Sequence, residues 1–212
     1  IHSRLAGSRL KKEYIPYNKI RDNSLKLAHD IHKSGFIPSV IYVCLRGGAY
    51  MGNIISEFFK IVCRDRTPVF YAAVVARSYA SPGERLQVVV DGWTYNPAHL
   101  RPGEKVLFVD DIFDSGHTIN HLVQCILKRG LRREDVKVAV HDYKIRDYPD
   151  PEHAILPDYY CRRHDLHSPE EDTWIHYMSH ELDGLPREAF DILFPDPDDS
   201  MKEVLKILGD HL

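Results

Sequence analysis

The stretch VLFVDDIFDSGHT, residues 106–118, changes its pattern twice within a short length of chain. Its first part, Val106 to Val109, has the length and β-branched character of a buried strand. Two carboxylates, Asp110 and Asp111, stand where that strand is expected to end. Apolar residues then recur with the spacing of one helix face, at Ile119, Leu122, Val123, Ile126 and Leu127. Gly130 is expected to end this helix, so the pattern predicts a strand, a loop and a helix.

The predicted loop has the features of a phosphate site. Backbone N–H groups at the start of a helix lack intrahelical partners and carry a positive partial charge. Gly116 lets the backbone approach an anion closely, and Ser115 and Thr118 add hydroxyl donors. The loop lacks the Gly-Lys-Ser/Thr ending of a Walker loop, but it offers a phosphate the same kind of backbone donors.

The acidic pair beside this loop narrows the choice of ligand. Asp110 and Asp111 would repel a bare phosphate. They suit a ligand that also carries hydroxyl groups, or a Mg²⁺ ion, which prefers oxygen ligands. A phosphorylated sugar with a bound metal meets both conditions. The alternative is a parallel strand that ends in two solvated acids and is followed by a capped helix.

The full order of residues closely resembles the phosphoribosyl pyrophosphate (PRPP) motif of the type I phosphoribosyltransferases: an apolar run, two acids, three spacers, then Ser-Gly-x-Thr. The resemblance implies an α/β fold with a mostly parallel central sheet flanked by helices and a small hood subdomain. It implies Mg²⁺-dependent transfer of the phosphoribosyl group from PRPP to a 6-oxopurine base (hypoxanthine, xanthine or guanine). The products would be a nucleoside monophosphate and pyrophosphate, as in purine salvage.

The resemblance also implies roles for the residues of the motif. Asp110 and Asp111 would hold the ribose hydroxyls, directly or through Mg²⁺ and water. Asp114 would face the base and take or hold its proton, which makes it the candidate catalytic residue. The 5′-phosphate would be bound by Ser115, Gly116, His117 and Thr118. His117 departs from the more frequent Gly or Lys, but its backbone amide can still bind a phosphate.

Strand and helix patterns alternate along the rest of the chain. The predicted strands are Val40–Leu45, Val69–Ala76, Leu86–Val90 and Val136–Val140. The further predicted helices are Asn18–Ser34, closed by Gly35, and Tyr50–Phe59. This alternation favours an α/β fold with a mostly parallel sheet. Ligands of such sheets bind at the C-terminal ends of the strands, where the loops meet.

A second loop, Arg46-Gly47-Gly48, follows the predicted strand Val40–Leu45. The guanidinium group of Arg46 and the amides of the two glycines suit a pyrophosphate. A turn with a surface arginine is the alternative. The loop resembles the pyrophosphate loop of the family, which implies a cis peptide bond between Leu45 and Arg46.

Ser78 and Tyr79 match the Ser-Tyr pair of the family's flexible loop, which closes over the reacting centre. The polar stretch that they begin, residues 78–84, contains the turn signal Pro82-Gly83. A lid is useful here because water would intercept an oxocarbenium-like transition state. A plain hairpin tip is the alternative.

Three residues are candidates for binding the base. The resemblance implies that Lys144, after the strand Val136–Val140, donates to the 6-oxygen of a purine; the alternative is a solvated lysine. The stretch Asp172-Thr173-Trp174-Ile175 resembles the hood of bacterial xanthine–guanine enzymes and related archaeal enzymes. There the aromatic ring, here Trp174, stacks on the base, and the backbone of the next residue, here Ile175, reads the ring edge. The alternative is a tryptophan of the core.

The chain divides, in this interpretation, into 1–17 as an N-terminal arm, 18–148 as the phosphoribosyltransferase core, 149–185 as the hood and 186–212 as a C-terminal helical extension. In the hood range, short strands of a separate subdomain are expected at 158–160 and 174–175. In the extension, Ser200 and Glu203 form a predicted capping box.

Composition limits the class of protein. The 212 residues suit one domain with room for a small appendage. A net charge of −3 does not favour a nucleic-acid-binding surface. No apolar run approaches the roughly 20 residues of a membrane span, and the first residues lack the apolar core of a secretion signal. We therefore expect a cytoplasmic protein with neither a nucleic-acid nor a membrane partner.

The four cysteines, Cys44, Cys63, Cys125 and Cys161, form no CxxC pair. They are expected to be free thiols in a reducing cytosol. Cys161 lies near His164 and His167, but a second pair of zinc ligands is missing. These three are therefore interpreted as loop residues.

Two other functions remain open from the sequence. One is a PRPP-binding regulator with little or no turnover. The other is a phosphohydrolase or receiver domain, which would use Asp110, Asp111 and Mg²⁺ as an acidic pocket. The leading interpretation is the transferase, with PRPP, a purine base, pyrophosphate and a nucleoside monophosphate as partners, and a homodimer as the expected assembly.

Overall fold

The computed structural model of the chain describes residues 11–64, 68–79, 87–147, 155–178, 182, 190 and 194–211. The chain divides into two compact units, Ile1–Ser179 and His180–Leu212. The first unit contains two β-sheets with their helices, and the second contains the helix α5 (Asp199–His211). The predicted boundaries at 148–149 and 185–186 lie outside the described residues.

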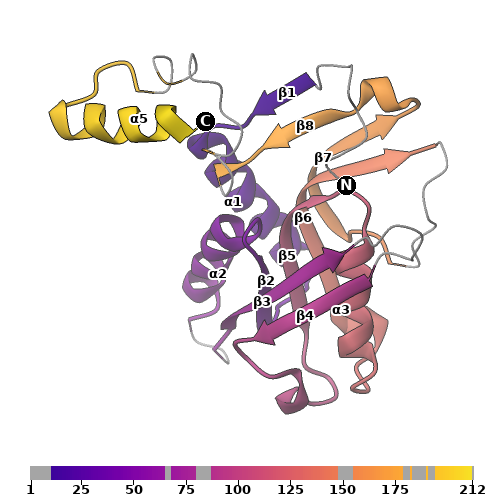
Figure 1. Cartoon of the computed structure of the whole chain (residues 1–212). Coiled ribbons are helices and arrows are strands. Elements are labelled where there is room, and N and C mark those ends of the chain that lie inside the picture. The colour runs from indigo at the N-terminus through magenta and orange to yellow at the C-terminus, as the bar shows by residue number, and fades with distance from the viewer. Residues whose placement is uncertain are drawn as a thin grey trace. The chain divides into compact units, whose positions relative to one another are not determined.

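A six-stranded sheet forms the centre of the first unit (Figure 1). Its strand order is β4-β3-β2-β5-β6-β7, and all neighbours are parallel except β3 and β4. The strands are β2 (Val40–Leu45), β3 (Phe70–Tyr79), β4 (Gln87–Trp93), β5 (Val106–Phe113), β6 (Val136–Arg146) and β7 (Tyr159–Leu166). Val40, Val106 and Val136 begin neighbouring parallel strands and are paired in register. The C-terminal ends of these strands therefore meet at one edge of the sheet, as the sequence predicts.

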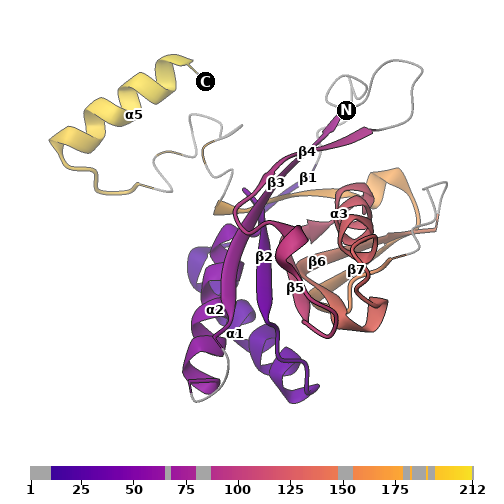
Figure 2. The same cartoon turned by 90° about the horizontal axis from the view of Figure 1, so that it is seen from below.

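Helices cover both faces of this sheet. Helices α1 (Tyr17–Lys33) and α2 (Ala49–Val62) lie on one side, and α3 (His117–Leu127) lies on the other (Figure 2). Gly35 after α1 and Gly130 after α3 have φ angles of 81° and 91°, the left-handed conformation that commonly ends a helix. The predicted α/β fold with a mostly parallel sheet is confirmed.

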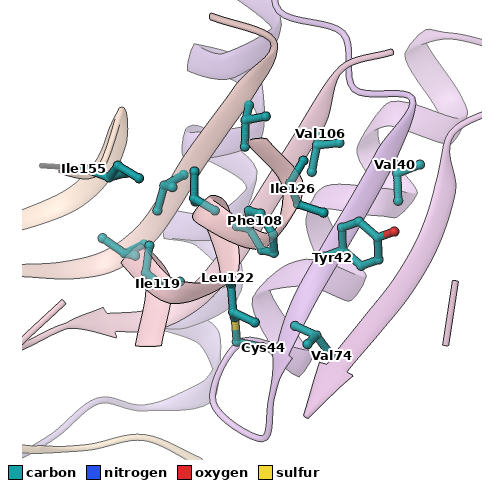
Figure 3. Close-up of a cluster of buried hydrophobic side chains, with 14 of the residues drawn as sticks. Val40, Tyr42, Cys44, Val74, Val106, Phe108, Ile119, Leu122, Ile126 and Ile155 are labelled. Atoms are coloured by element: carbon teal, nitrogen blue, oxygen red, sulfur yellow. The ribbon is translucent and has the colours of Figure 1, made fainter. Parts of the chain in front are cut away.

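The core is divided by the sheet into two apolar layers. On the side of α3, Ile119, Leu122 and Ile126 pack with Tyr42 and Phe108 of the strands (Figure 3). The layer on the opposite face contains Ile41 and Leu107 with residues of α1 and α2. Successive residues of β2 and β5 thus point to opposite faces, and both faces are buried. This explains why these strands are continuously apolar and do not alternate.

A small second sheet pairs the beginning of the described chain with the hood. Strand β1 (Lys11–Tyr14) runs parallel to β8 (Thr173–His176). The ring of Tyr14 stacks on that of His176 with 4.7 Å between centroids, and the N–H of Ile15 donates to the His176 carbonyl at 3.2 Å. The described residues also form the short 3₁₀ turns η1 (Pro97–His99), η2 (Arg133–Asp135) and η3 (Pro169–Glu171).

Two neighbouring strands, β5 and β6, run further than the sequence patterns predict. Strand β5 continues past Asp110 and Asp111 to Phe113, and β6 continues to Arg146. Lys144 therefore lies within β6 and does not follow it. The strands lengthen together because each supplies the backbone partners of the other, with Phe113 beside Tyr143. A polar side chain does not end a strand whose backbone groups remain paired.

Two predictions for the hood range are wrong. Tyr159 and Tyr160 belong to β7, which pairs with β6 in the main sheet and not in a separate subdomain. Cys161 and His164 lie in β7 and not in a loop, and Cys161 packs against the core on the α1 side. β7 is placed in the main sheet by its hydrogen bonds to β6. Because the paired residues are distant in the chain, no local sequence pattern predicts this pairing.

The predicted capping box of α5 is also corrected. The backbone N–H of Met201 donates to the Asp198 carboxylate at 2.8 Å, so Asp198, and not Ser200, caps the helix.

None of the helices in the described part of the chain is long and apolar enough to cross a membrane. All four cysteines are free thiols, as expected, and Cys44 and Cys63 are buried.

Candidate active site

The loop between β5 and α3 has the geometry that its sequence predicts. Gly116, at the N-cap of α3, has a φ of 69°, a conformation that favours glycine. Asn120 fixes this turn because its amide donates to the carbonyls of Gly116 at 3.1 Å and Ile155 at 2.8 Å. The first N–H groups of α3 are therefore held at the C-terminal edge of the sheet, where an anion can bind.

A cavity of about 200 Å³ opens beside this loop. Its lining comes from the ends of β2, β3 and β5 and from the start of α3: Cys44, Leu45, Ala76, Asp110, Ile112, Phe113, Asp114, Ser115, Gly116, Thr118 and Ile119. Asp110, Asp114 and three residues of the phosphate loop thus face one space. The structure brings these sequence-predicted residues together.

The two acids of β5 differ in their surroundings. Asp111 is buried, and Asp110 is half-buried and accepts the N–H of Asp111 at 3.0 Å. Burial raises the pKa of the Asp110 carboxyl well above its ordinary value, and the neighbouring charge of Asp111 adds to the effect. Burial likewise raises the pKa of the Cys44 thiol, which hydrogen-bonds to Asp110. A bound cation would relieve the crowding of the two acids.

The Arg46-Gly47-Gly48 loop lies against these acids. A Cβ atom at Gly47 would overlap the Asp111 carboxylate, and one at Gly48 would overlap the Val109 carbonyl. Both positions therefore require glycine, for reasons of space. The bond between Leu45 and Arg46 is cis, as the family resemblance implies. Arg46 is exposed at the tip of the loop.

Ser78 and the phosphate loop are also close together. The Ser78 and Thr118 hydroxyls lie 3.0 Å apart, within hydrogen-bonding distance. Tyr79 is the last residue of β3, and the remainder of the predicted lid, residues 80–86, lies outside the described residues. At the root of the hairpin, Arg77 forms an ion pair with Asp91 of β4 at 2.5 Å.

Lys144 is buried, so the alternative of a solvated lysine is wrong. Its ammonium group donates to the Asp172 carboxylate at 2.5 Å and to the Thr173 carbonyl at 3.0 Å. Arg146 lies two residues further along the same strand, and its guanidinium group binds both Asp114 and Asp172. These bonds lower the pKa of the Asp172 carboxyl, although burial acts in the opposite direction. The sequence patterns predict no role for Arg146 or Asp172.

The hood residues have distinct environments. Trp174 in β8 is 45% exposed, so it is not a tryptophan of the core. Its ring contacts that of His176, with 6.3 Å between centroids. Ile175 is buried in the core layer of α1 and α2, which fixes the strand that carries Trp174. An exposed ring on an anchored strand is suited to stacking on a flat ligand.

The chemistry of the acidic pair fits Mg²⁺. Asp110 and Asp111 offer oxygen ligands, and their crowding favours a positive charge between them. No group of three or more potential metal ligands occurs among the described residues. Mg²⁺ often binds through one or two carboxylates together with substrate oxygens and water. The residues therefore fit a metal that arrives with a phosphorylated substrate.

The sequence contains one indirect indication that Arg146 belongs to the site, and none for Asp172. Lys144 and Arg146 alternate on one strand, so they project to the same side. Their acidic partners lie 28 and 32 residues away in the chain. No local pattern predicts that four such charges meet.

These features define an α/β protein with a mostly parallel sheet, a glycine-capped loop before a helix at the end of β5, and a glycine-rich basic loop at the end of β2. The model of the phosphoribosyl transferase domain matches residues 15–158. The chain belongs to the phosphoribosyltransferase family.

Two curated relatives are hypoxanthine-guanine phosphoribosyltransferases. The protein from Cricetulus griseus is 28% identical over 134 residues, which cover 61% of this chain and 60% of the relative. The protein from Bos taurus is 27% identical over the same length and coverage. The chain thus spans about three fifths of the length of the curated relatives it matches.

Two solved structures share the fold. A purine phosphoribosyltransferase from Pyrococcus horikoshii has a TM-score of 0.57 at 20% identity, with 79% of this chain and 92% of that chain covered. A hypothetical protein from Neisseria gonorrhoeae with bound ppGpp has a TM-score of 0.61 at 22% identity, with 83% and 93% covered. At these identities the likeness concerns the fold alone.

Proposed function

We propose that the protein transfers the phosphoribosyl group of PRPP to a 6-oxopurine base. The observation that carries this proposal is the meeting of three elements at adjacent strand ends: the phosphate loop of residues 115–118, the acids Asp110 and Asp111, and the glycines of the basic loop. A sugar that carries a phosphate at one end and a pyrophosphate at the other has a partner for each group. The two curated relatives, both named for hypoxanthine and guanine, support the choice of base.

In the proposed reaction a purine nitrogen attacks C1 of PRPP, the bond from C1 to the pyrophosphate oxygen breaks, and C1 is inverted. Ser115, Gly116, His117 and Thr118 fix the 5′-phosphate and thereby position C1. Asp110 and Asp111 accept the ribose hydroxyls. Asp114, which faces the cavity, accepts the proton that the purine nitrogen loses. Arg46, Gly47 and Gly48 bind the pyrophosphate.

Mg²⁺ is the proposed cofactor, held by Asp110 and Asp111 together with substrate oxygens. When bound, it neutralises negative charge on the leaving pyrophosphate. Ser78 and Tyr79 begin the proposed lid, which excludes water from the reacting centre. By family resemblance, we further propose that the protein works in the cytoplasm as a homodimer.

The base would bind between the hood and the end of β6. Lys144 donates to the purine 6-oxygen, and Trp174 stacks on the ring. Stacking of this kind contributes about 1–3 kcal/mol per base. The backbone at Ile175 reads the edge near C2, where hypoxanthine, xanthine and guanine differ.

The first experiment incubates the protein with PRPP, a panel of nucleobases and Mg²⁺, and measures nucleotide and pyrophosphate. We expect turnover with one or more 6-oxopurines, and its loss when EDTA replaces Mg²⁺. PRPP binding in calorimetry without turnover on any base would support the PRPP-binding regulator. Release of inorganic phosphate from PRPP would support a phosphohydrolase.

The acid–base role is tested by Asp114→Asn. Because the amide cannot accept the proton of the base, kcat should fall about 100-fold. The PRPP dissociation constant, measured by calorimetry, should change far less. Asp22→Asn on the exposed surface of α1 is the matched control, and it should leave both quantities unchanged. Equal turnover in wild type and Asp114→Asn would contradict this role.

A further inference from the structure

Four alternating charges form a ring at the end of β6. Lys144 lies 2.5 Å from Asp172, Asp172 lies 2.9 Å from Arg146, and Arg146 forms an ion pair with Asp114. Asp114 lies 3.9 Å from the Lys144 ammonium, which closes the ring. We call these four residues the charge ring. It combines two cations from one strand with one carboxylate directly before the phosphate loop and one from the hood.

Arg146 makes the connection between the two loops. Its Nη2 donates to the carboxylates of both Asp114 and Asp172, and its Nη1 donates to the backbone carbonyl of Asp114 at 3.0 Å. Its side chain is only 11% exposed. A planar guanidinium can bridge two carboxylates in this way, whereas the point charge of a lysine cannot hold the same geometry.

The charge ring also determines how many N–H donors of the Lys144 ammonium group remain for a ligand. An ammonium group has three donors, and two are used by Asp172 and by the Thr173 carbonyl. At 3.9 Å, Asp114 is too distant to accept the third. Because Arg146 holds the Asp114 carboxylate, that carboxylate does not close the gap to Lys144. Among the described residues, no further acceptor of Lys144 lies within hydrogen-bonding distance, so the third donor can bind an oxygen of a ligand.

We infer that Arg146 is a positioning residue that keeps Asp114 and Lys144 apart and ties the phosphate loop to the hood. The inference rests on the proposed function, because Asp114 and Lys144 are its candidate acid–base and base-binding groups. Arg146 touches neither reacting atom. Its loss frees Asp114 to pair with Lys144, which removes the donor for the purine 6-oxygen and misplaces the proton acceptor. It also removes one of the two cations that bind Asp172, two residues before Trp174.

The structural part is tested by hydrogen exchange on the full chain without ligand. In Arg146→Met, the amides of residues 114–118 and 172–176 should exchange faster than in wild type. Arg146→Lys should behave more like Arg146→Met than like wild type, because charge alone does not bridge two carboxylates. The matched control is Arg163→Met, whose guanidinium pairs with Asp165 on the same strand. Wild-type exchange in Arg146→Met at both segments would overturn the inference.

The functional part is tested by steady-state kinetics and calorimetry. In Arg146→Met, KM for the base should rise and kcat should fall, so that kcat/KM drops about 10- to 100-fold. The PRPP dissociation constant should change less than KM for the base, since Asn120 still holds the turn at Gly116 and the pyrophosphate loop does not contact Asp172. A wild type without turnover on any purine refutes the proposed function, whereas the exchange experiment still decides the role of Arg146. An active wild type with an equally active Arg146→Met overturns the inference alone.

Discussion

Asp142 shows how much one buried side chain can organise. It is fully buried in β6 and accepts from His141 and His164 at 2.6 Å each, from Arg162 at 2.6 Å and from the Tyr177 hydroxyl at 2.5 Å. These donors come from two strands of the main sheet and from the segment after β8. Burial by itself would raise the pKa of this carboxyl, but the hydrogen bonds outweigh it and hold the pKa well below its ordinary value.

Replacing this carboxylate should destabilise the protein. Asp142→Asn removes the fully buried charged acceptor of Arg162, which then keeps only the more exposed Glu13, so the free energy of unfolding at neutral pH should fall by about 3 kcal/mol. Because the native pKa is depressed, the contribution is complete above the unfolded pKa of about 4 and is lost as pH falls towards the native value. Urea unfolding at several pH values should therefore show a difference that shrinks below about pH 4.

The control for this prediction is Asp165→Asn. Asp165 lies on β7 but is exposed, and it pairs with Arg163 two residues before it in the chain. Its replacement should change the unfolding midpoint little. If Asp142→Asn unfolds at the same urea concentration as wild type at neutral pH, the network around Asp142 does not stabilise the fold.

Helix α2 lies unusually close to strand β2. A Cβ atom at Gly52 would collide with the Cγ1 atom of Val43, and it would lie 3.5 Å from the Tyr71 ring. This contact determines the distance between α2 and the sheet. The same helix begins directly after the Arg46-Gly47-Gly48 loop, so this contact also positions the proposed pyrophosphate loop.

This contact can be tested by adding a methyl group at Gly52 and removing side-chain volume at Val43. Gly52→Ala should lower the free energy of unfolding by about 1–3 kcal/mol, because the added methyl group overpacks the interface. In Gly52→Ala/Val43→Ala the space is restored, so the double variant should be more stable than the sum of the two single effects predicts. Urea denaturation measures all three variants.

Gly92→Ala serves as the control, because nothing lies within 4 Å of its Cβ position. It should not reproduce the loss. Strict additivity of the Gly52 and Val43 substitutions would show that the helix does not depend on this contact.

Strand β8 of the hood lies in the first compact unit, and it pairs there with a strand from near the N-terminus. Strand β1 is the hydrogen-bonded partner of β8, which carries Trp174. Glu13 forms an ion pair with Arg162 at 2.5 Å, so β1 is also tied to the Asp142 network. The segment at 11–14, which the sequence analysis set aside as an arm, therefore supports the proposed base site.

Truncation of the N-terminus tests whether β1 contributes to the proposed base site. Removing residues 1–14 deletes β1 and leaves one edge of β8 unpaired, so KM for the base should rise about tenfold. PRPP binding in calorimetry should be almost unchanged, because its proposed contacts come from the strand ends of the main sheet. Removing only residues 1–10 is the control. Equal base KM values for the two truncated proteins would exclude a role of β1 in the base site.

Much of the fold was accessible from local sequence. Strand β2 has the predicted bounds, and α1 differs from its predicted bounds by one residue at each end. Apolar runs, helical spacing and terminal glycines are local signals, and local backbone preference follows them. The ends of β5 and β6 were missed because a strand continues as long as its neighbour pairs with it.

The sequence by itself indicated the family and located the proposed phosphate loop and the acidic pair, because each depends on a few consecutive residues with local backbone preferences. Only the tertiary structure decided that β7 joins the main sheet and that β1 pairs with the hood. It also decided that Arg146 meets Asp114 and Asp172. These contacts join residues far apart in the chain, and they form because charges and backbone groups removed from water must find partners.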